Sequence, residues 1–125
     1  MPRPKILIVE DDFLGAERAR LLLEAAGYEV VGLAPRTDDA LRLAQEHAPD
    51  LAIVDLMLEV DVDGMHTATE LARRHGLKII IATGFPDTVV AHETVRDLGC
   101  ALVRKPYTDD ELLSAVAACL ATGAS

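Results

Sequence analysis

Residues 6–12 of the chain are ILIVEDD, four apolar residues followed at once by three acids. A short, uncharged run rich in β-branched residues predicts a strand buried on both faces rather than a helix. Three further apolar runs also end in a group suited to phosphate: LAIV before Asp55, IIIA before Thr83 and ALVR before Lys105. We expect these runs to be parallel strands, and in open α/β sheets ligands bind beyond the carboxyl ends of the strands.

Helical patterns alternate with strand patterns along the chain. We expect strands at residues 6–9, 28–33, 51–54, 79–82 and 101–104, and helices at residues 13–26, 38–47, 65–75, 86–98 and 108–120. Thr37 is the expected N-cap of the second helix, Pro86 lies in the expected first turn of the fourth, and Gly27 is the expected left-handed end of the first. Strict alternation predicts one domain, residues 1–125, with a parallel sheet covered on both faces.

Composition and charge limit the partners of the chain. The formal net charge is −9 and the isoelectric point is near 4.7, which argues against binding to a nucleic-acid backbone or an anionic membrane surface. No signal-peptide pattern opens the chain, and no apolar stretch approaches the roughly 18 residues of a membrane span. Cys100 and Cys119 fall in apolar patterns typical of core thiols in a reducing cytosol, so a cytoplasmic location is expected.

Polar residues follow the predicted strands in a fixed order, the pair Glu10-Asp11, then Asp55, then Thr83, then the pair Lys105-Pro106. Each alone has an ordinary explanation as a turn residue, helix cap or surface side chain. Together, in this order and spacing, they make nearly the whole chain resemble a response-regulator receiver domain. The resemblance implies a flavodoxin-like α/β fold, a doubly wound five-stranded parallel sheet in the order 2-1-3-4-5 with five helices. That order would place Asp11 and Asp55 side by side on neighbouring strands.

The chemistry of the acids agrees with phosphoryl transfer. A carboxylate can take a phosphoryl group as a covalent nucleophile, and crowded carboxylates need a cation to stay ionised together. A few hard oxygen ligands, with room left for water and phosphate oxygens, favour Mg²⁺. The resemblance implies that Asp55 is the phosphoacceptor and that Asp11 and Asp55 bind Mg²⁺ directly. It also implies that Glu10 binds the ion mostly through water and that the Met57 main-chain carbonyl completes the protein ligands.

Thr83 and Lys105 complete the expected site. The Thr83 hydroxyl and the Lys105 ammonium would hold the other oxygens of the transferred phosphoryl group. The lysine must turn back over the crevice directly after a strand, and an X-Pro bond is the one peptide for which the cis form is inexpensive. The Lys105-Pro106 bond is therefore predicted to be cis.

The resemblance further implies a role in signalling. The chain would receive its phosphoryl group from the phosphohistidine of a sensor histidine kinase or a phosphotransfer protein. It would not act as an enzyme on other substrates and would catalyse only its own phosphorylation and dephosphorylation. Output would pass to an unidentified partner or to a homodimer formed by the fourth helix, fifth strand and fifth helix. The mixed charges on that face either pair across a dimer or are plain solvated surface: Arg96, Asp97, Arg104 and Asp109.

The chain departs from the family pattern in two places. Most receivers have Met-Pro after the acceptor and a Gly eight residues on, whereas Gly64 lies nine residues after Asp55 and the Pro is missing. We therefore expect the loop that carries Met57 to be one residue longer. Leu102 stands where many receivers have the aromatic residue that swings inward with the Thr. Residues 81–85, IATGF, are instead similar to the Phe-Ala-Thr-Gly-Tyr-type motif of a subgroup of stand-alone receivers from alphaproteobacteria.

Three alternatives compete with this interpretation. A flavodoxin-like module would bind a flavin or another small ligand at the same crevice, although the loops lack a Ser/Thr/Gly-rich phosphate cradle and stacking aromatics. A hydrolase with an Asp nucleophile typically has a second Asp two residues later, where this chain has Met57. Residues 59–70 nearly match a Ca²⁺-binding loop, but the first position is Glu59 and the preceding segment is a strand pattern rather than a helix.

Overall fold

The computed structural model describes residues 3–56, 64–98 and 101–121. Its five parallel strands form one sheet in the order β2-β1-β3-β4-β5, which confirms the expected strand order. The strands are β1 Lys5–Val9, β2 Glu29–Ala34, β3 Leu51–Asp55, β4 Lys78–Thr83 and β5 Ala101–Arg104. The five expected helices are also present, namely α1 Phe13–Ala25, α2 Thr37–His47, α3 Gly64–His75, α4 Val89–Leu98 and α5 Asp109–Ala121.

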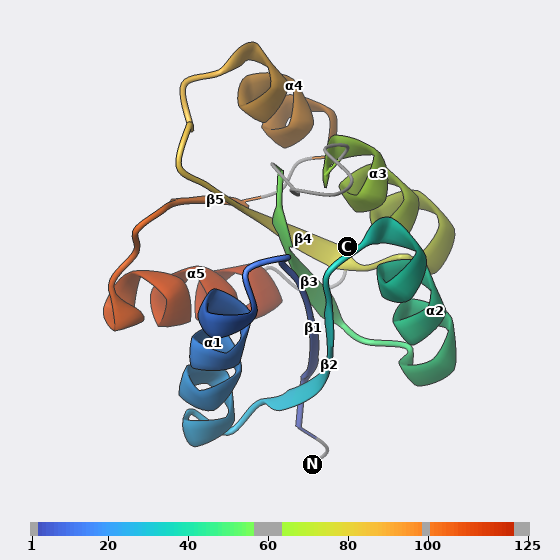
Figure 1. Ribbon diagram of the computed structural model, residues 1–125, viewed down its shortest axis with the longest axis vertical. Helices are drawn as coiled ribbons and strands as arrows, with labels where there is room; N and C mark the ends of the chain where they lie inside the picture. The colour runs from blue at the N-terminus through green and yellow to red at the C-terminus, as the bar shows by residue number, and fades with distance from the viewer. Residues whose placement is uncertain (1–2, 57–63, 99–100, 122–125) are drawn as a thin grey trace.

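Both faces of the sheet are covered because the central strands bury both sets of their alternating side chains. In β1, Ile6 and Ile8 pack with residues of α1 and α5, whereas Leu7 and Val9 pack with residues of α2, α3 and α4. Figure 1 shows α1 and α5 together on one side of the strands and α2 with α3 on the other. The sheet is thus held between two apolar cores.

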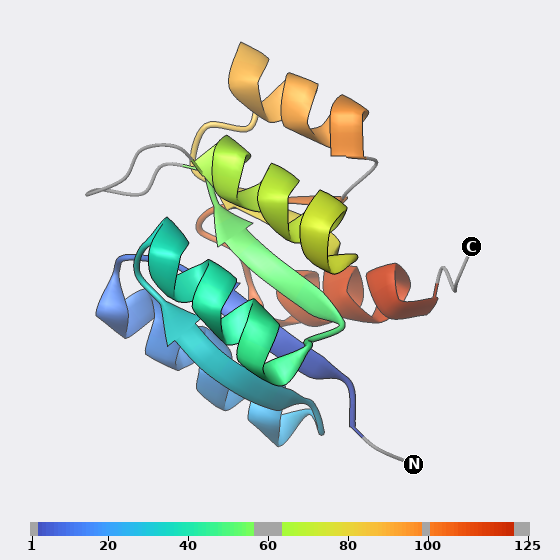
Figure 2. The same ribbon diagram turned by 90° about the vertical axis from the view of Figure 1, so that its right-hand side faces the viewer.

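The parallel arrangement brings the carboxyl ends of the strands to one edge of the sheet. In Figure 2 the arrowheads of β2 and β3 point the same way along the sheet. The residue pairs that face each other near this edge are Val9 with Val54, Asp55 with Ala82, and Thr83 with Arg104. Polar residues that end or follow β1, β3, β4 and β5 therefore gather in one place.

The helix ends follow the expectation at α1 and depart from it at α2. Gly27 has a φ of +99°, which confirms the left-handed end of α1. Thr37 was expected to be the N-cap of α2, and this prediction is wrong. Arg36 is the N-cap, and Thr37 is the buried first helical residue, with its hydroxyl 2.5 Å from that of Thr67 on α3. None of the helices in the described ranges is long and apolar enough to cross a membrane.

α4 and α5 both begin after a threonine cap. α4 starts beyond the turn that contains Pro86, later than expected, because the Thr88 hydroxyl accepts a hydrogen bond from the Ala91 N–H at 3.2 Å. At α5 the Thr108 hydroxyl accepts from the Glu111 N–H at 3.1 Å, and the Glu111 carboxylate accepts from the Thr108 N–H at 2.8 Å. Such reciprocal bonds satisfy N–H groups that a helix start leaves without partners.

Candidate functional site

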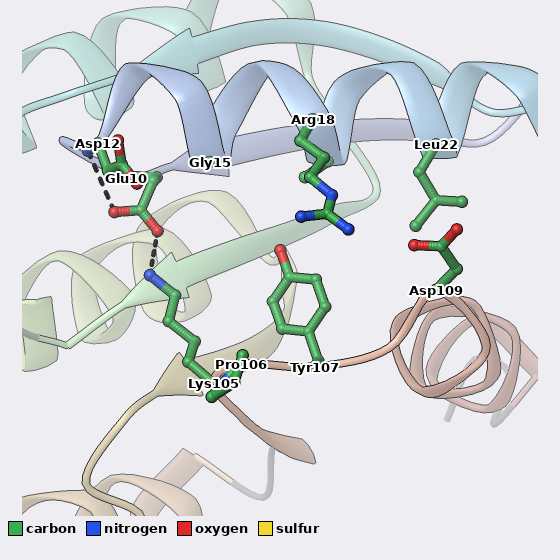
Figure 3. Close-up of a pocket in the computed structure, with 10 residues that line it drawn as sticks. Glu10, Asp12, Gly15, Arg18, Leu22, Lys105, Pro106, Tyr107 and Asp109 are labelled. Carbon is green, nitrogen blue, oxygen red and sulfur yellow. Dashed lines mark hydrogen bonds and ion pairs between the residues drawn. The ribbon is translucent and has the colours of Figure 1, made fainter.

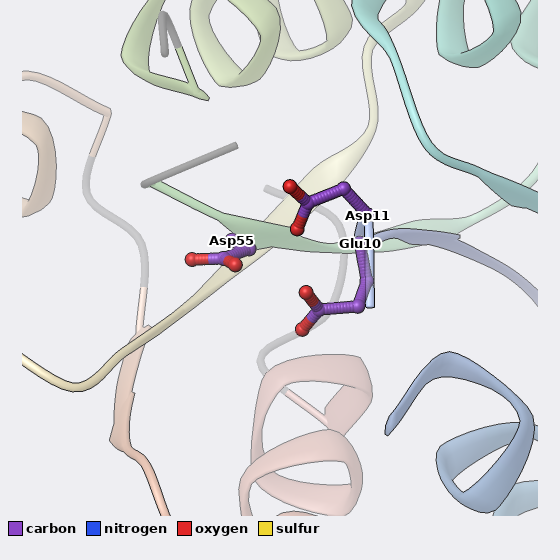
Figure 4. A group of neighbouring side chains, drawn as sticks. All are labelled: Glu10, Asp11 and Asp55. Atoms are coloured by element: carbon purple, nitrogen blue, oxygen red, sulfur yellow. The ribbon is translucent and has the colours of Figure 1, made fainter. Parts of the chain in front are cut away.

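Three acids meet at the carboxyl edge of the sheet. Glu10 and Asp11 follow β1, and Asp55 ends the neighbouring strand β3. One carboxylate oxygen from each residue lies within 4.8 Å of those from the other two, and Figure 4 shows the three side chains extending into one region. The expectation that Asp11 and Asp55 would be neighbours is confirmed. Three clustered carboxylates are the hard oxygen ligands that Mg²⁺ prefers, so the residues fit this ion.

Lys105 follows β5 and reaches back across the edge of the sheet to the acids. Its ammonium donates to the Glu10 carboxylate and to Oδ2 of Asp55, from which Nζ lies 3.3 Å away. Its main-chain N–H donates to the Thr83 carbonyl at 2.8 Å. The Lys105-Pro106 bond is cis, as predicted. One ammonium therefore partly balances two carboxylates.

Burial and charge act against each other at this cluster. The side chains of Glu10 and Asp55 are each only 10% exposed. Burial raises the pKa of Glu10 to about 7, because loss of solvation outweighs the hydrogen bond and charge of Lys105, and the Asp55 charge adds to the increase. Burial opposes the charged form of Lys105, but the hydrogen bond and charge of Glu10, with those of Asp55, raise the pKa of the ammonium. Without a metal ion, Glu10 is therefore partly protonated near neutral pH, alongside a charged lysine.

Thr83 ends β4, the strand next to the one that carries Asp55. It comes directly after Ala82, which faces Asp55 across the two strands. Its side chain is buried, and its hydroxyl accepts a hydrogen bond from the Phe85 N–H at 3.0 Å. The hydroxyl is thus at the expected strand end and is engaged by the turn that follows.

The loop after Asp55 is only partly described. Met57, expected to offer a main-chain carbonyl, lies outside the described residues, as do Glu59 and the start of the possible Ca²⁺ loop. At Gly64 the N–H donates to the Leu56 carbonyl at 3.3 Å. A Cβ at Gly64 would lie 2.4 Å from the Asp55 carbonyl oxygen, so a glycine is required for this close approach.

A cavity of about 330 Å³ opens beside the cluster, between α1 and the segment that joins β5 to α5. It is lined by Glu10, Asp12, Gly15, Arg18, Ala19, Leu22, Lys105, Pro106, Tyr107 and Asp109. Figure 3 shows Arg18 and Tyr107 facing each other, with the pair formed by Lys105 and Glu10 at one end. Neither Arg18 nor Tyr107 is predicted from the sequence, because only the tertiary fold brings them together. The one available signal was the helical spacing that places residues 15, 18, 19 and 22 on one face of α1.

Comparison with known proteins supports the same family. The family model for the response regulator receiver domain matches residues 6–117. The signal receiver domain of a modulated diguanylate cyclase from Desulfovibrio desulfuricans G20 is 33% identical, has a TM-score of 0.86 and is aligned over 96% of this chain and 95% of its own. The receiver domain of the PhyR response regulator from Erythrobacter litoralis has a TM-score of 0.89, and the match covers 100% of this chain and 95% of that one. Because it is only 21% identical, this likeness supports the fold alone.

A curated relative from Mycobacterium tuberculosis agrees with this result. The transcriptional regulatory protein PdtaR is 34% identical over 117 residues, which cover 93% of this chain and 56% of that protein. The chain thus spans about half the length of the first curated relatives it matches. Because the family model matches most of the chain, this protein belongs to the response-regulator receiver domain family of two-component systems.

Proposed function

We propose that this chain is a phosphorylation switch in which Asp55 takes a phosphoryl group from a phosphohistidine, with Mg²⁺ held at the acid cluster. The observation that supports it most is the convergence of Glu10, Asp11 and Asp55 with the Lys105 ammonium at the strand edge of a receiver-family chain. Membership of this family sets aside the flavin-binding and hydrolase alternatives. In this proposal residues 1–125 act as one receiver domain.

The proposed transfer needs an ionised Asp55 oxygen in line with the phosphorus atom. That oxygen forms the new P–O bond while the P–N bond to the donor imidazole breaks, and the electron pair of the broken bond stays on the imidazole. Lys105 already contacts Asp55 and would move a short distance to an oxygen of the transferred group. Its charge would then stabilise the phosphoryl group where negative charge develops, and the Thr83 hydroxyl would bind a second oxygen.

In the proposal Asp11 and Asp55 bind Mg²⁺ directly, Glu10 binds it mainly through water, and the Met57 carbonyl is a further ligand. The ion supplies positive charge that offsets the charge of the transferring group. With a divalent cation beside its carboxylate, Glu10 no longer needs the Lys105 ammonium as its partner. Release of Lys105 from Glu10 would free the ammonium for the phosphoryl group.

The proposed phosphodonor is a sensor histidine kinase or a phosphotransfer protein, and α1 offers it a contact surface. Phe13, Leu14 and Leu21 on α1 are large apolar side chains exposed to solvent. Leu14 lies one helical turn from Arg18, which lines the cavity beside Lys105. A donor that brings a phosphohistidine to the acceptor must cover this rim, so burial of these apolar side chains would supply binding energy.

Output is proposed to pass through the face of α4, β5 and α5, to an unidentified partner or to a second copy of the chain. β5 is an edge strand, and a groove of about 410 Å³ lies between it and α5. Arg104 and Glu111 line this groove with opposite charges that two copies could pair. Arg96 and Asp97 pair with each other at 3.2 Å on exposed surface, so we expect little from them. If the mass in solution is that of a monomer both with and without a bound phosphoryl analogue, the homodimer is excluded and output must pass to another protein.

The proposal also assigns the chain to the cytoplasm. Cys119 is a partly buried thiol on α5, and burial raises the pKa of this thiol, which keeps it in the less reactive form. Reduced thiols of this kind are typical of the cytosol.

Beryllofluoride, which mimics a phosphoryl group on a carboxylate, tests the proposed function. With Mg²⁺ it should raise the Tm of the parent chain, because it binds only the folded state. It should give no increase in EDTA or in Asp55→Asn. Asp12→Asn makes the same chemical change at an exposed acid next to the cluster and should keep the increase. An increase that persists in Asp55→Asn, or none in the parent, would count against the proposal.

A further inference from the structure

The cavity between α1 and the segment that joins β5 to α5 touches the acid cluster at one end only. Lys105 and Glu10 lie at that end, and Leu22 and Asp109 lie at the other (Figure 3). Its volume of about 330 Å³ is in the range of small-molecule sites. Phosphoryl transfer to Asp55 makes no use of the far part of this cavity, so its lining indicates what else the chain can bind.

Part of the cavity wall is apolar. Ala19 and Leu22 contribute to it from α1, and Pro106 and the ring of Tyr107 contribute from the facing segment. Tyr107 is half-buried and packs against the core that lies under α1 and α5, which restricts the motion of its ring. The apolar body of a small molecule placed between these two walls would lose contact with water, which favours binding.

Arg18 brings a positive charge into the cavity from α1. No acid in the described ranges lies within ion-pair distance of its guanidinium, whereas Arg20 on the same helix pairs with Glu17 and Glu24. Lys105, which also lines the cavity, is held by the acid cluster. A guanidinium that faces a cavity without an acidic partner is suited to a carboxylate, which it can bind through two parallel hydrogen bonds.

The Tyr107 hydroxyl faces Arg18 across the cavity (Figure 3), and no hydrogen bond joins either side chain to another of the lining residues drawn there. Burial raises the pKa of Tyr107, so the phenol keeps its proton at neutral pH and can donate it. A guanidinium and a phenol that face one space are donors that lack an oxygen between them. One carboxylate group would supply that oxygen to both.

The acids of the lining restrict the charge of the ligand. Glu10 and Asp12 lie at the end near Asp55, and Asp109 lies at the far end. The lining thus holds three acids against two cations, so an ion with several negative charges would be repelled from both ends. A single carboxylate beside Arg18, in the middle of the cavity, avoids most of this repulsion.

We propose that this cavity binds a small monocarboxylate with an apolar body, of the aromatic carboxylic acid class. The carboxylate binds the Arg18 guanidinium and the Tyr107 hydroxyl, and the apolar body lies against Ala19 and Leu22. The inference does not depend on phosphorylation of Asp55, because the ligand needs neither the acceptor nor Mg²⁺. Such a site gives the chain a second input, a small molecule, beside the phosphodonor.

Titration of the full chain with phenylacetate, followed by NMR, tests the inference. The probe should bind saturably, with a Kd of roughly 1–10 mM for so small a molecule, and should shift the amides of residues 18 and 107. Phenylacetamide has nearly the same shape without the charge, and it should bind roughly tenfold or more weakly, because a charge-assisted bond is lost. Inorganic phosphate at matched ionic strength should leave both amides unshifted.

Variants assign the binding to the cavity. Arg18→Gln should weaken phenylacetate binding roughly tenfold or more, and Tyr107→Phe, which loses a neutral hydrogen bond, should weaken it roughly threefold to tenfold. Arg20→Gln makes the same chemical change two residues away, at an arginine that does not line the cavity, and should keep the parent affinity. Arg18 is exposed, so its variant should fold, and the Tm of each variant checks this.

Saturable binding that is weakened in Arg18→Gln and kept in Arg20→Gln supports the inference. It is refuted if none of phenylacetate, 3-phenylpropionate and hexanoate binds saturably, or if phenylacetamide binds as tightly as phenylacetate. Equal weakening in Arg18→Gln and Arg20→Gln also refutes it, because the general charge of α1 would then attract the probe. None of these outcomes bears on phosphorylation of Asp55, so the proposed function is tested separately.

Discussion

In the metal-free protein, ionisation of Glu10 is expected to cost stability. Burial raises the pKa of Glu10 from 4.5 to about 7, despite the pairing with Lys105. An acid with a higher pKa in the folded chain stabilises the fold below its unfolded pKa, and this stabilisation is lost as the pH rises through the folded pKa. Glu10→Gln keeps the shape of the neutral acid at every pH. The variant should therefore be more stable than the parent above about pH 7 and similar to it below pH 4.5.

The expected size of the effect follows from the same pKa values. One pKa unit corresponds to about 1.4 kcal/mol, so the difference between 4.5 and about 7 sets an upper limit of roughly 3 kcal/mol. Water reaches part of the cluster, and screening should reduce the difference in the free energy of unfolding to about 1–2 kcal/mol. In a chain of 125 residues this corresponds to a Tm higher by roughly 4–8 °C.

Urea unfolding in EDTA, at several pH values from about 4.5 to about 8, measures this difference directly. Glu17→Gln on α1 is a matched control with the opposite expected sign. The hydrogen bond from Arg20 lowers the pKa of Glu17, so its charge stabilises the fold above the unfolded pKa, and removing that charge should lower stability near pH 8. Mg²⁺ should reduce the difference in the free energy of unfolding between the parent and Glu10→Gln, because the cation stabilises the ionised Glu10 carboxylate of the parent.

Two results would refute the reasoning. Glu10→Gln could prove less stable than the parent near pH 8, or its difference from the parent could stay constant across the pH range. In the first case the ion pair with Lys105 would outweigh burial, and in the second the two effects would balance; in neither case would the fold raise the pKa of Glu10.

Three further predictions concern the site and its signal. Asp11→Asn removes a charge within 4.8 Å of two other acids, so in EDTA its free energy of unfolding should rise by about 1 kcal/mol, and its Tm should rise with it. The stabilisation of this variant by Mg²⁺ should be smaller than that of the parent. A Tm below that of the parent in EDTA would contradict this prediction. Gly64→Ala should lower the free energy of unfolding, measured in urea, by roughly 3 kcal/mol, because the new Cβ would overlap the main chain. Gly84→Ala should be nearly neutral, because a Cβ at Gly84 meets open space. Equal effects of the two substitutions would contradict the close approach at Gly64. The family resemblance implies that Met57 and Phe85 border the path of the water that hydrolyses the aspartyl phosphate, and neither side chain can orient this water. The purified phosphoprotein should therefore release phosphate slowly, and the double variant Met57→Asn with Phe85→Glu should release it roughly 10- to 100-fold faster. An unchanged rate of phosphate release in the double variant would contradict this prediction.

The strands were predictable because their signal is local and their environment uniform. Residues 6–9 and 79–82 are apolar at every position. In so short a segment, an unbroken apolar run is typical of a strand that is buried on both faces. The helix starts were harder, since several residues near a start satisfy the same rules. Pro86 suits a first helical turn and Thr88 suits a cap, and the hydroxyl bond to Ala91 decides for the later start.

The candidate site was predictable in its members and not in its pairings. The order of polar residues at the strand ends identified Glu10, Asp11 and Asp55, because parallel strands bring their carboxyl ends together. Glu10 and Asp55 are equally buried, so the choice of Glu10 as the main partner of Lys105, 95 residues away, depends on how the fold places the two carboxylates around the ammonium. No local pattern carries that information. The same reason hid the partnership of the buried hydroxyls of α2 and α3, which are 30 residues apart.

Chemical trapping of the acyl phosphate tests the central claim most directly. The chain is incubated with acetyl phosphate and Mg²⁺, reduced with borohydride, digested and mapped by mass spectrometry. The account predicts modification at Asp55 alone, lost in EDTA and in Asp55→Asn and retained in Asp12→Asn. Modification at a different residue, or labelling of Asp55→Asn equal to that of the parent, would contradict it.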